Sequence, residues 1–135
     1  MCIRDRLWVA VLIGTVLTGS GPHAGDDRVP RNGLDGMLLT HLHSGVVYAT
    51  IAATLLCLAL LRSRAALLLL VVEAVQAAIG LAQYNLGLPI ELVALHLLGA
   101  ALAIAAATNL MLSVRSRRSL PNPSRLQPET FATSA

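Results

Sequence analysis

Three apolar segments, each long enough to cross a bilayer, limit what this chain can fold into. A transmembrane helix needs about 20 predominantly apolar residues. Charged residues are only 13% of the chain, against about 25% in soluble domains. The sequence predicts an all-α, polytopic membrane four-helix bundle over residues 7–113, whose first helix is short and truncated. The predicted spans are 7–20, 37–61, 65–86 and 89–113.

The arginines predict the orientation of these spans, because cytoplasmic loops of membrane proteins are enriched in basic residues. With four spans, one side of the membrane receives seven of them: Arg4, Arg6, Arg62, Arg64, Arg115, Arg117 and Arg118. We therefore expect a multi-pass protein of the cell (plasma) membrane with both termini cytoplasmic and the 19–36 loop outside. Residues 114–135 are rich in Pro, Ser and Asn and are predicted to form a disordered cytoplasmic tail.

Familiar soluble-enzyme motifs are absent from the sequence. The two cysteines, Cys2 and Cys57, form no CxxC or CxxCH pair, so neither a disulfide nor covalent c-type haem attachment is predicted. The basic net charge comes from arginines between apolar segments, which indicates membrane topology and no nucleic-acid partner.

Two histidines lie at matched depths in the predicted second and fourth spans. His43 follows Met37 by six residues and His96 follows Pro89 by seven, which places both about 10 Å below the outer face. Those spans run in the same direction and lie diagonally across an up-down-up-down bundle. Facing imidazoles are what a bis-histidine haem requires. The alternative is two interface histidines bonded to neighbouring backbones.

Other residues near these histidines leave alternatives open. Gly99 and Ala100 begin a stripe of small residues below His96, which would flank a flat macrocycle or simply allow close helix packing. His41 competes with His43, but points about 200° away from it on a helix. We rank His43 first because it lies deeper.

The outer loop and the third span hold further polar candidates. His23, Arg28 and Arg31 are candidates for contacts with haem propionates, since arginine pairs well with carboxylates; the alternative is a solvated loop of balanced charge. Glu73 lies inside the third span, where an acid is a functional candidate. Its distance from the predicted haem level favours a neutral, hydrogen-bonded interface residue.

Three motifs make the chain resemble the C-terminal half of haem A synthase, of the bacterial, actinobacterial type. They read GTVLTGSGPHAGD, HLHSGVVYAT and IGLAQYNLGLPIELVALHLLGA, within a resemblance that runs from about Leu7 to Leu112. That family has two similar four-helix halves, and its C-terminal half holds a haem b cofactor. The resemblance implies that His43 and His96 are the axial ligands of haem b.

The family is an oxidoreductase that oxidises a methyl group of haem O to the formyl group of haem A, for cytochrome oxidase. Its catalytic glutamate belongs to the N-terminal half, which this chain lacks, so the resemblance assigns no catalytic residue here. It implies as partners membrane lipid, an N-terminal half, haem O as substrate and haem O synthase. The rival functions are a small membrane cytochrome b-type electron-transfer subunit and a transport or assembly protein without a cofactor.

Overall fold

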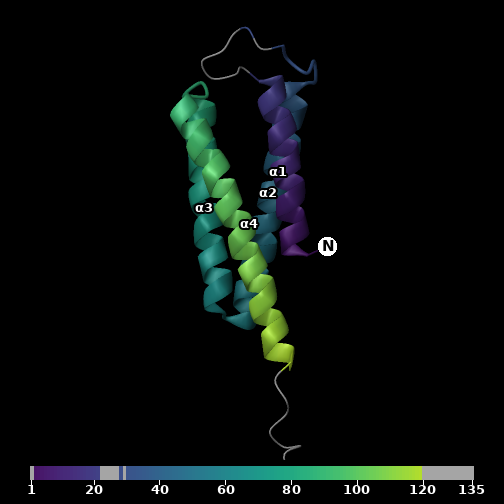
Figure 1. Ribbon diagram of the computed structural model, residues 1–135, viewed down its shortest axis with the longest axis vertical. Helices are drawn as coiled ribbons and strands as arrows, with labels where there is room; N and C mark the ends of the chain where they lie inside the picture. The colour runs from purple at the N-terminus through teal and green to yellow at the C-terminus, as the bar shows by residue number, and fades with distance from the viewer. Residues whose placement is uncertain (1, 22–27, 29, 120–135) are drawn as a thin grey trace, which may run out of the picture.

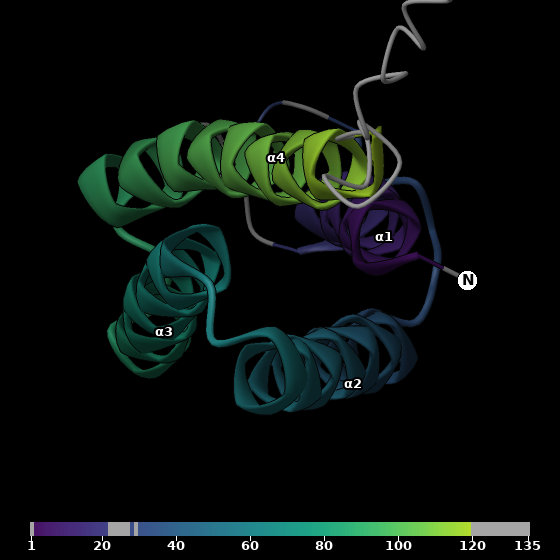
Figure 2. The ribbon, with the colours of Figure 1, turned by 90° about the horizontal axis from the view of Figure 1, so that it is seen from below.

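The computed structural model describes residues 2–21, 28 and 30–119, and this part of the chain forms four α-helices. They are α1 (Ile3–Ser20), α2 (Gly36–Leu61), α3 (Arg64–Asn85) and α4 (Ile90–Ser119). Neighbours along the chain pack side by side, and α4 closes the ring against α1 (Figures 1 and 2). The described residues therefore form the expected all-α four-helix bundle, in which α2 and α4 lie diagonally.

Local sequence explains where the helices begin and end. The Asp35 carboxylate accepts hydrogen bonds from the backbone N–H groups of Met37 and Leu38, which caps α2. The Ser63 hydroxyl caps α3 by accepting from the Ala66 N–H. The short turn between α3 and α4 uses Gly87 at φ 74°, a conformation that glycine adopts without steric cost. The short connections at residues 62–63 and 86–89 make α3 antiparallel to both α2 and α4.

Two helix boundaries differ from the predicted ones by more than one residue. Helix α1 begins at Ile3, four residues before the predicted start at 7. Helix α4 continues to Ser119 where the prediction ended it at 113. The cause is that SVRSRRS contains no helix breaker before Pro121, and arginines at a helix C-terminus interact favourably with the helix dipole. The predicted disordered tail therefore begins too early at 114, and its residues 120–135 lie outside the described part of the chain.

Three of the described helices, α2, α3 and α4, are long and apolar enough to cross a membrane. Large apolar side chains cover their outward faces, among them Leu60 at 73% and Leu81 at 65% exposure. Continuous apolar surface on this scale is unusual in water. It fits contact with lipid and a multi-pass membrane protein.

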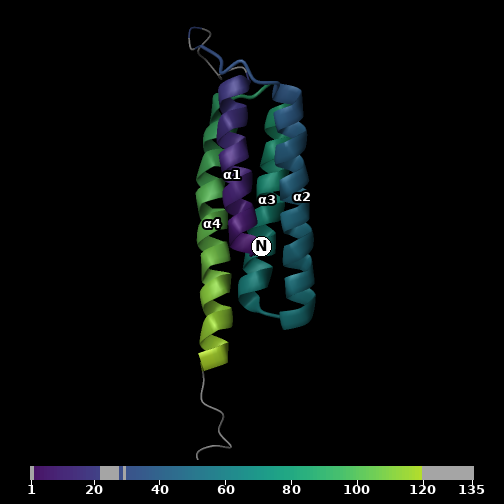
Figure 3. The same ribbon diagram turned by 90° about the vertical axis from the view of Figure 1, so that its right-hand side faces the viewer.

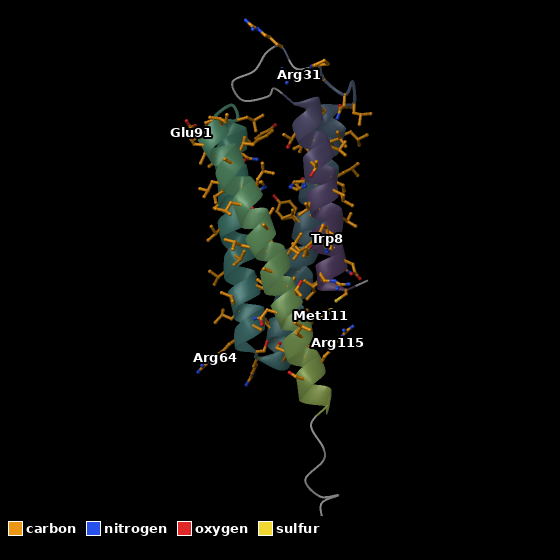
Figure 4. The ribbon with its side chains drawn as sticks, viewed as in Figure 1. Trp8, Arg31, Arg64, Glu91, Met111 and Arg115 are labelled. Atoms are coloured by element: carbon orange, nitrogen blue, oxygen red, sulfur yellow. The ribbon has the colours of Figure 1, made fainter. Side chains whose placement is uncertain are left out.

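Helix α1 is not among these three, because it carries Arg4, Asp5 and Arg6 in its first turns. The Arg6 guanidinium donates to the backbone carbonyl of Ala49, in the middle of α2. The start of α1 lies alongside α2 and short of the α2–α3 turn (Figure 3). Arg64 and Arg115 lie towards the same end of the bundle, on opposite sides of it, and Arg31 lies at the other end (Figure 4).

Buried side chains are concentrated in the half of the bundle that contains the α2–α3 turn. The apolar cluster there consists of Leu7, Ala66, Leu69, Ala103, Ala106, Ala107 and Leu110. Towards the opposite end the α1–α2 pair diverges from the α3–α4 pair (Figure 1). No residue in that half is fully buried, in the described segments 11–20, 36–49, 74–85 and 90–98. The helices are therefore packed tightly at one end and loosely at the end where His43 and His96 lie.

Leu69→Ala is expected to destabilise the bundle by about 2–5 kcal/mol, because it leaves a cavity in the tightly packed half. Leu69 is fully buried, whereas its neighbour Leu68 is 51% exposed. Reversible unfolding in mixed detergent micelles measures the difference. The control Leu68→Ala should change stability by no more than about 0.5 kcal/mol, and equal losses in both variants would contradict this description of the core.

Candidate histidine pair

The imidazoles of His43 and His96 meet in the interior of the bundle. Their ring centroids are 6.4 Å apart and their planes are inclined by 67°. The two helices that carry them are diagonal and do not pack on each other, so the side chains span the space between the helix pairs. Both rings are half-buried, while His41 is exposed. The structure thus directs His43 inward and His41 outward.

A backbone carbonyl of α1 holds the His43 ring in place. The His43 Nδ1 lies 2.9 Å from the Ala10 carbonyl oxygen, at hydrogen-bonding distance. The ring can approach so closely because residue 14 is glycine: a Cβ there would lie 3.0 Å from His43 Cε1. When Nδ1–H donates to the carbonyl, Nε2 is left with its lone pair. This is the tautomer that a metal-ligating histidine needs.

The His96 ring has a similar environment on α3. Gly80 lies against the His96 ring as Gly14 lies against the His43 ring. A Cβ at position 80 would lie 3.2 Å from His96 Cε1. The His96 Nδ1 is buried and does not complete a hydrogen bond. Each ring is therefore backed by a glycine on the adjacent helix, and the His43 ring is also held by a backbone carbonyl.

The separation of the two rings agrees with ligation of one metal ion from opposite sides. A metal–imidazole bond is about 2 Å long, and the ring centre lies about 1 Å beyond the nitrogen, so the centroids would be about 6 Å apart. The observed value is 6.4 Å. Aromatic rings in simple contact also lie about 4.5–7 Å apart, so this distance alone is compatible with both arrangements.

The donor set decides which metal group fits. In the described part of the chain, no group of three or more His, Cys, Asp or Glu side chains is placed to hold a metal ion. A structural zinc site needs four such ligands and a catalytic one needs three. Two facing imidazoles suffice for haem iron, because the porphyrin provides the remaining nitrogens. The residues present therefore fit a bis-histidine haem and do not fit a zinc site.

The stripe of small residues on α4 packs mainly against other helices. Gly99 lies against the Gln76 side chain, whose Nε2 would be 1.5 Å from a Cβ at position 99. Further along, Ala103 and Ala107 belong to the apolar cluster. Close helix packing, the alternative that the sequence left open, therefore describes these three residues. Ala100 is half-buried, and contact of Gly99 or Ala100 with a haem stays a prediction.

The outer loop is tied to the end of α1. The Asn32 side chain donates to the Val16 carbonyl, and the Arg31 guanidinium donates to the Gly21 carbonyl. Arg28 is exposed, and the predicted candidate His23 lies outside the described residues. Contacts of these three loop residues with haem propionates remain predictions.

Two parts of the site were missed in the sequence. Gly14 and Gly80 back the histidine rings, although the sequence shows them only as glycines within apolar segments. A glycine inside a helix is destabilising relative to alanine. The presence of glycine at these two helical positions was therefore the feature of the sequence that could have indicated a close contact. Their role depends on the rotation of α1 and α3, which hydropathy does not determine.

The fold and this pair of residues define a class: a membrane helix bundle with two imidazoles facing each other in its interior. Comparison with known proteins adds no family, since no family model, curated protein or solved structure matches the chain.

Proposed function

We propose that the chain binds one haem b between His43 and His96 and is the cofactor half of a haem A synthase. The observation that carries the proposal is the inward-facing pair of imidazoles with centroids 6.4 Å apart. Support also comes from the loose packing around them and from the three motifs that resemble the family. The proposed location is the plasma membrane, with both termini cytoplasmic.

The chain's own residues would bind the cofactor and exclude water from it. The Nε2 atoms of His43 and His96 would be the axial ligands, and the Ala10 carbonyl orients the first ring through Nδ1. When bound, haem supplies one-electron transfer between an external donor and the substrate haem. The apolar helices give the site a low dielectric constant, which is one of the means by which proteins adjust haem potentials.

Oxidation of haem O to haem A would take place in the complete enzyme, an oxidoreductase whose catalytic residues lie in an N-terminal half. That half, haem O and haem O synthase are the proposed partners. A small cytochrome b-type electron-transfer subunit is the second candidate, because the same histidine geometry serves electron transfer alone. Co-expression with a four-helix N-terminal half separates the two: formation of haem A supports the synthase, and unchanged haem O supports the carrier.

Haem binding itself is tested by purifying the chain in detergent and measuring haem as its pyridine complex. We expect one b-type haem per chain, extractable by acidified acetone because no cysteine pair attaches it. The control His41→Ala should keep the same haem content, since His41 is exposed. A haem-free protein after expression with an ample haem supply would refute the proposal.

A further inference from the structure

Glu73 is a buried acid that the proposed haem site does not use. It lies in the middle of α3, and only 4% of the residue is exposed. The Thr54 hydroxyl, from α2, donates to its Oε1 over 3.0 Å. Its Oε2 is buried and has no hydrogen-bond partner. One carboxyl oxygen is therefore fixed across a helix interface while the other has no partner.

No charged side chain balances Glu73 within the described part of the chain. An ion pair found there joins Arg4 and Asp5, far from Glu73 in the sequence. Among titratable groups on the helices packed against α3, His43 and His96 face the interior and Cys57 is half-buried near Thr54. The others on these helices whose side chains the structure describes are exposed, and so is Arg62 at the end of α2: His41, Tyr48, Glu91 and Arg115. A charge on Glu73 would thus interact mainly with groups in the interior of the bundle.

Packing alone does not account for an acid at this position. A buried polar group without a partner costs free energy, and acids inside a membrane are rare and functional. Glutamine has the same size and would accept the same hydrogen bond from Thr54. What distinguishes glutamate from glutamine here is its ability to bind and release a proton.

Glu73 lies close enough to the histidine pair to sense a charge there. Gly80 contacts the His96 ring, and Glu73 precedes Gly80 by seven residues, or about 10 Å along α3. Charges at this separation interact appreciably in a medium of low dielectric constant. Salt does not screen buried charges as it screens exposed ones.

We propose that Glu73 is a proton-binding site whose occupancy follows the oxidation state of the haem iron. The inference rests on the proposed function, because it needs a haem between the histidines. A one-electron reductant converts Fe(III) to Fe(II), and the carboxylate takes one proton from water, on the Oε2 that has no partner. The total charge inside the bundle then stays constant, and the proton is released when the iron is oxidised again.

The test compares the haem midpoint potential of the wild-type chain and Glu73→Gln over a range of pH, with dithionite as reductant. Proton uptake makes the wild-type potential fall as pH rises, by at most about 59 mV per tenfold change in proton concentration. Glu73→Gln should keep the haem spectrum and lose this component. The control Glu91→Gln removes an exposed carboxylate and should behave like wild type.

Redox-difference infrared spectroscopy supplies a second readout. A carboxyl C=O band should rise on reduction, disappear in Glu73→Gln and shift in Thr54→Val, which removes the hydroxyl that bonds to Oε1. If the haem spectrum is present but wild type and Glu73→Gln share the same pH dependence and lack this band, the inference is wrong and the proposed function stands. A wild-type chain that binds no haem overturns both.

Discussion

His43→Ala and His96→Ala are each expected to remove the six-coordinate haem, which is the largest effect predicted for any substitution in this chain. Each variant deletes one of the two imidazoles whose centroids lie 6.4 Å apart. Haem content should fall by about tenfold or more, a loss of at least 1.4 kcal/mol of binding free energy. Any haem that remains should be five-coordinate and high-spin. Absorption spectra of the purified variants, with haem quantified as the pyridine complex, measure both quantities.

Two controls separate loss of a ligand from loss of the fold. His41→Ala alters the exposed histidine two residues from His43 and should leave the spectrum unchanged. Added imidazole should restore a low-spin spectrum to both alanine variants, because it can occupy the volume of the deleted ring. If either alanine variant retained a wild-type low-spin spectrum, that histidine would not be a ligand.

Gly14→Leu and Gly80→Leu should produce the second-largest effect, although neither glycine would touch iron. Even a Cβ atom would crowd the rings. At position 14 it would lie 3.0 Å from His43 Cε1, and at position 80 it would lie 3.2 Å from His96 Cε1. The longer leucine side chain must displace each ring from its position, and at position 14 it must also break the bond from His43 to the Ala10 carbonyl. Groups that orient metal ligands typically contribute about 10- to 100-fold in affinity. Titration of the haem-free variants with haemin should show a loss of this size.

Gly45→Leu is the matched control for the Gly14→Leu and Gly80→Leu substitutions. Gly45 lies within α2, and a Cβ there would meet nothing within 4 Å. It therefore tests the general cost of placing leucine at a helical glycine, apart from contact with a histidine. Equal losses of haem affinity at positions 14, 80 and 45 would contradict the role given to the two glycines.

Hydropathy predicts most of this fold because long apolar segments leave few alternatives. The ends of the observed α2 and α3, Gly36–Leu61 and Arg64–Asn85, differ from those of the predicted spans by no more than one residue. The C-terminal end of α4 was missed because polarity marks the edge of the membrane and not the end of a helix. The arginine-rich segment after Ser113 leaves the apolar stretch and yet continues the helix.

The depth of His43 and His96 was predictable, but their surroundings were not. A uniform rise per residue places two histidines at one level from sequence alone. Which glycine lies behind each ring, and which carbonyl bonds to His43, depends on how α1 and α3 are rotated about their axes. The apolar residues around these helices carry little information about that rotation. For the same reason, the sequence could suggest that Glu73 is hydrogen-bonded without identifying Thr54 as its partner.

The most direct test of the account is electron paramagnetic resonance of the ferric wild-type chain, combined with near-infrared magnetic circular dichroism to identify the axial ligands. A single low-spin haem with two imidazole ligands is the expected result. High-spin haem, a ligand other than histidine, or a chain that takes up no haem would contradict the claim that His43 and His96 hold one iron between them.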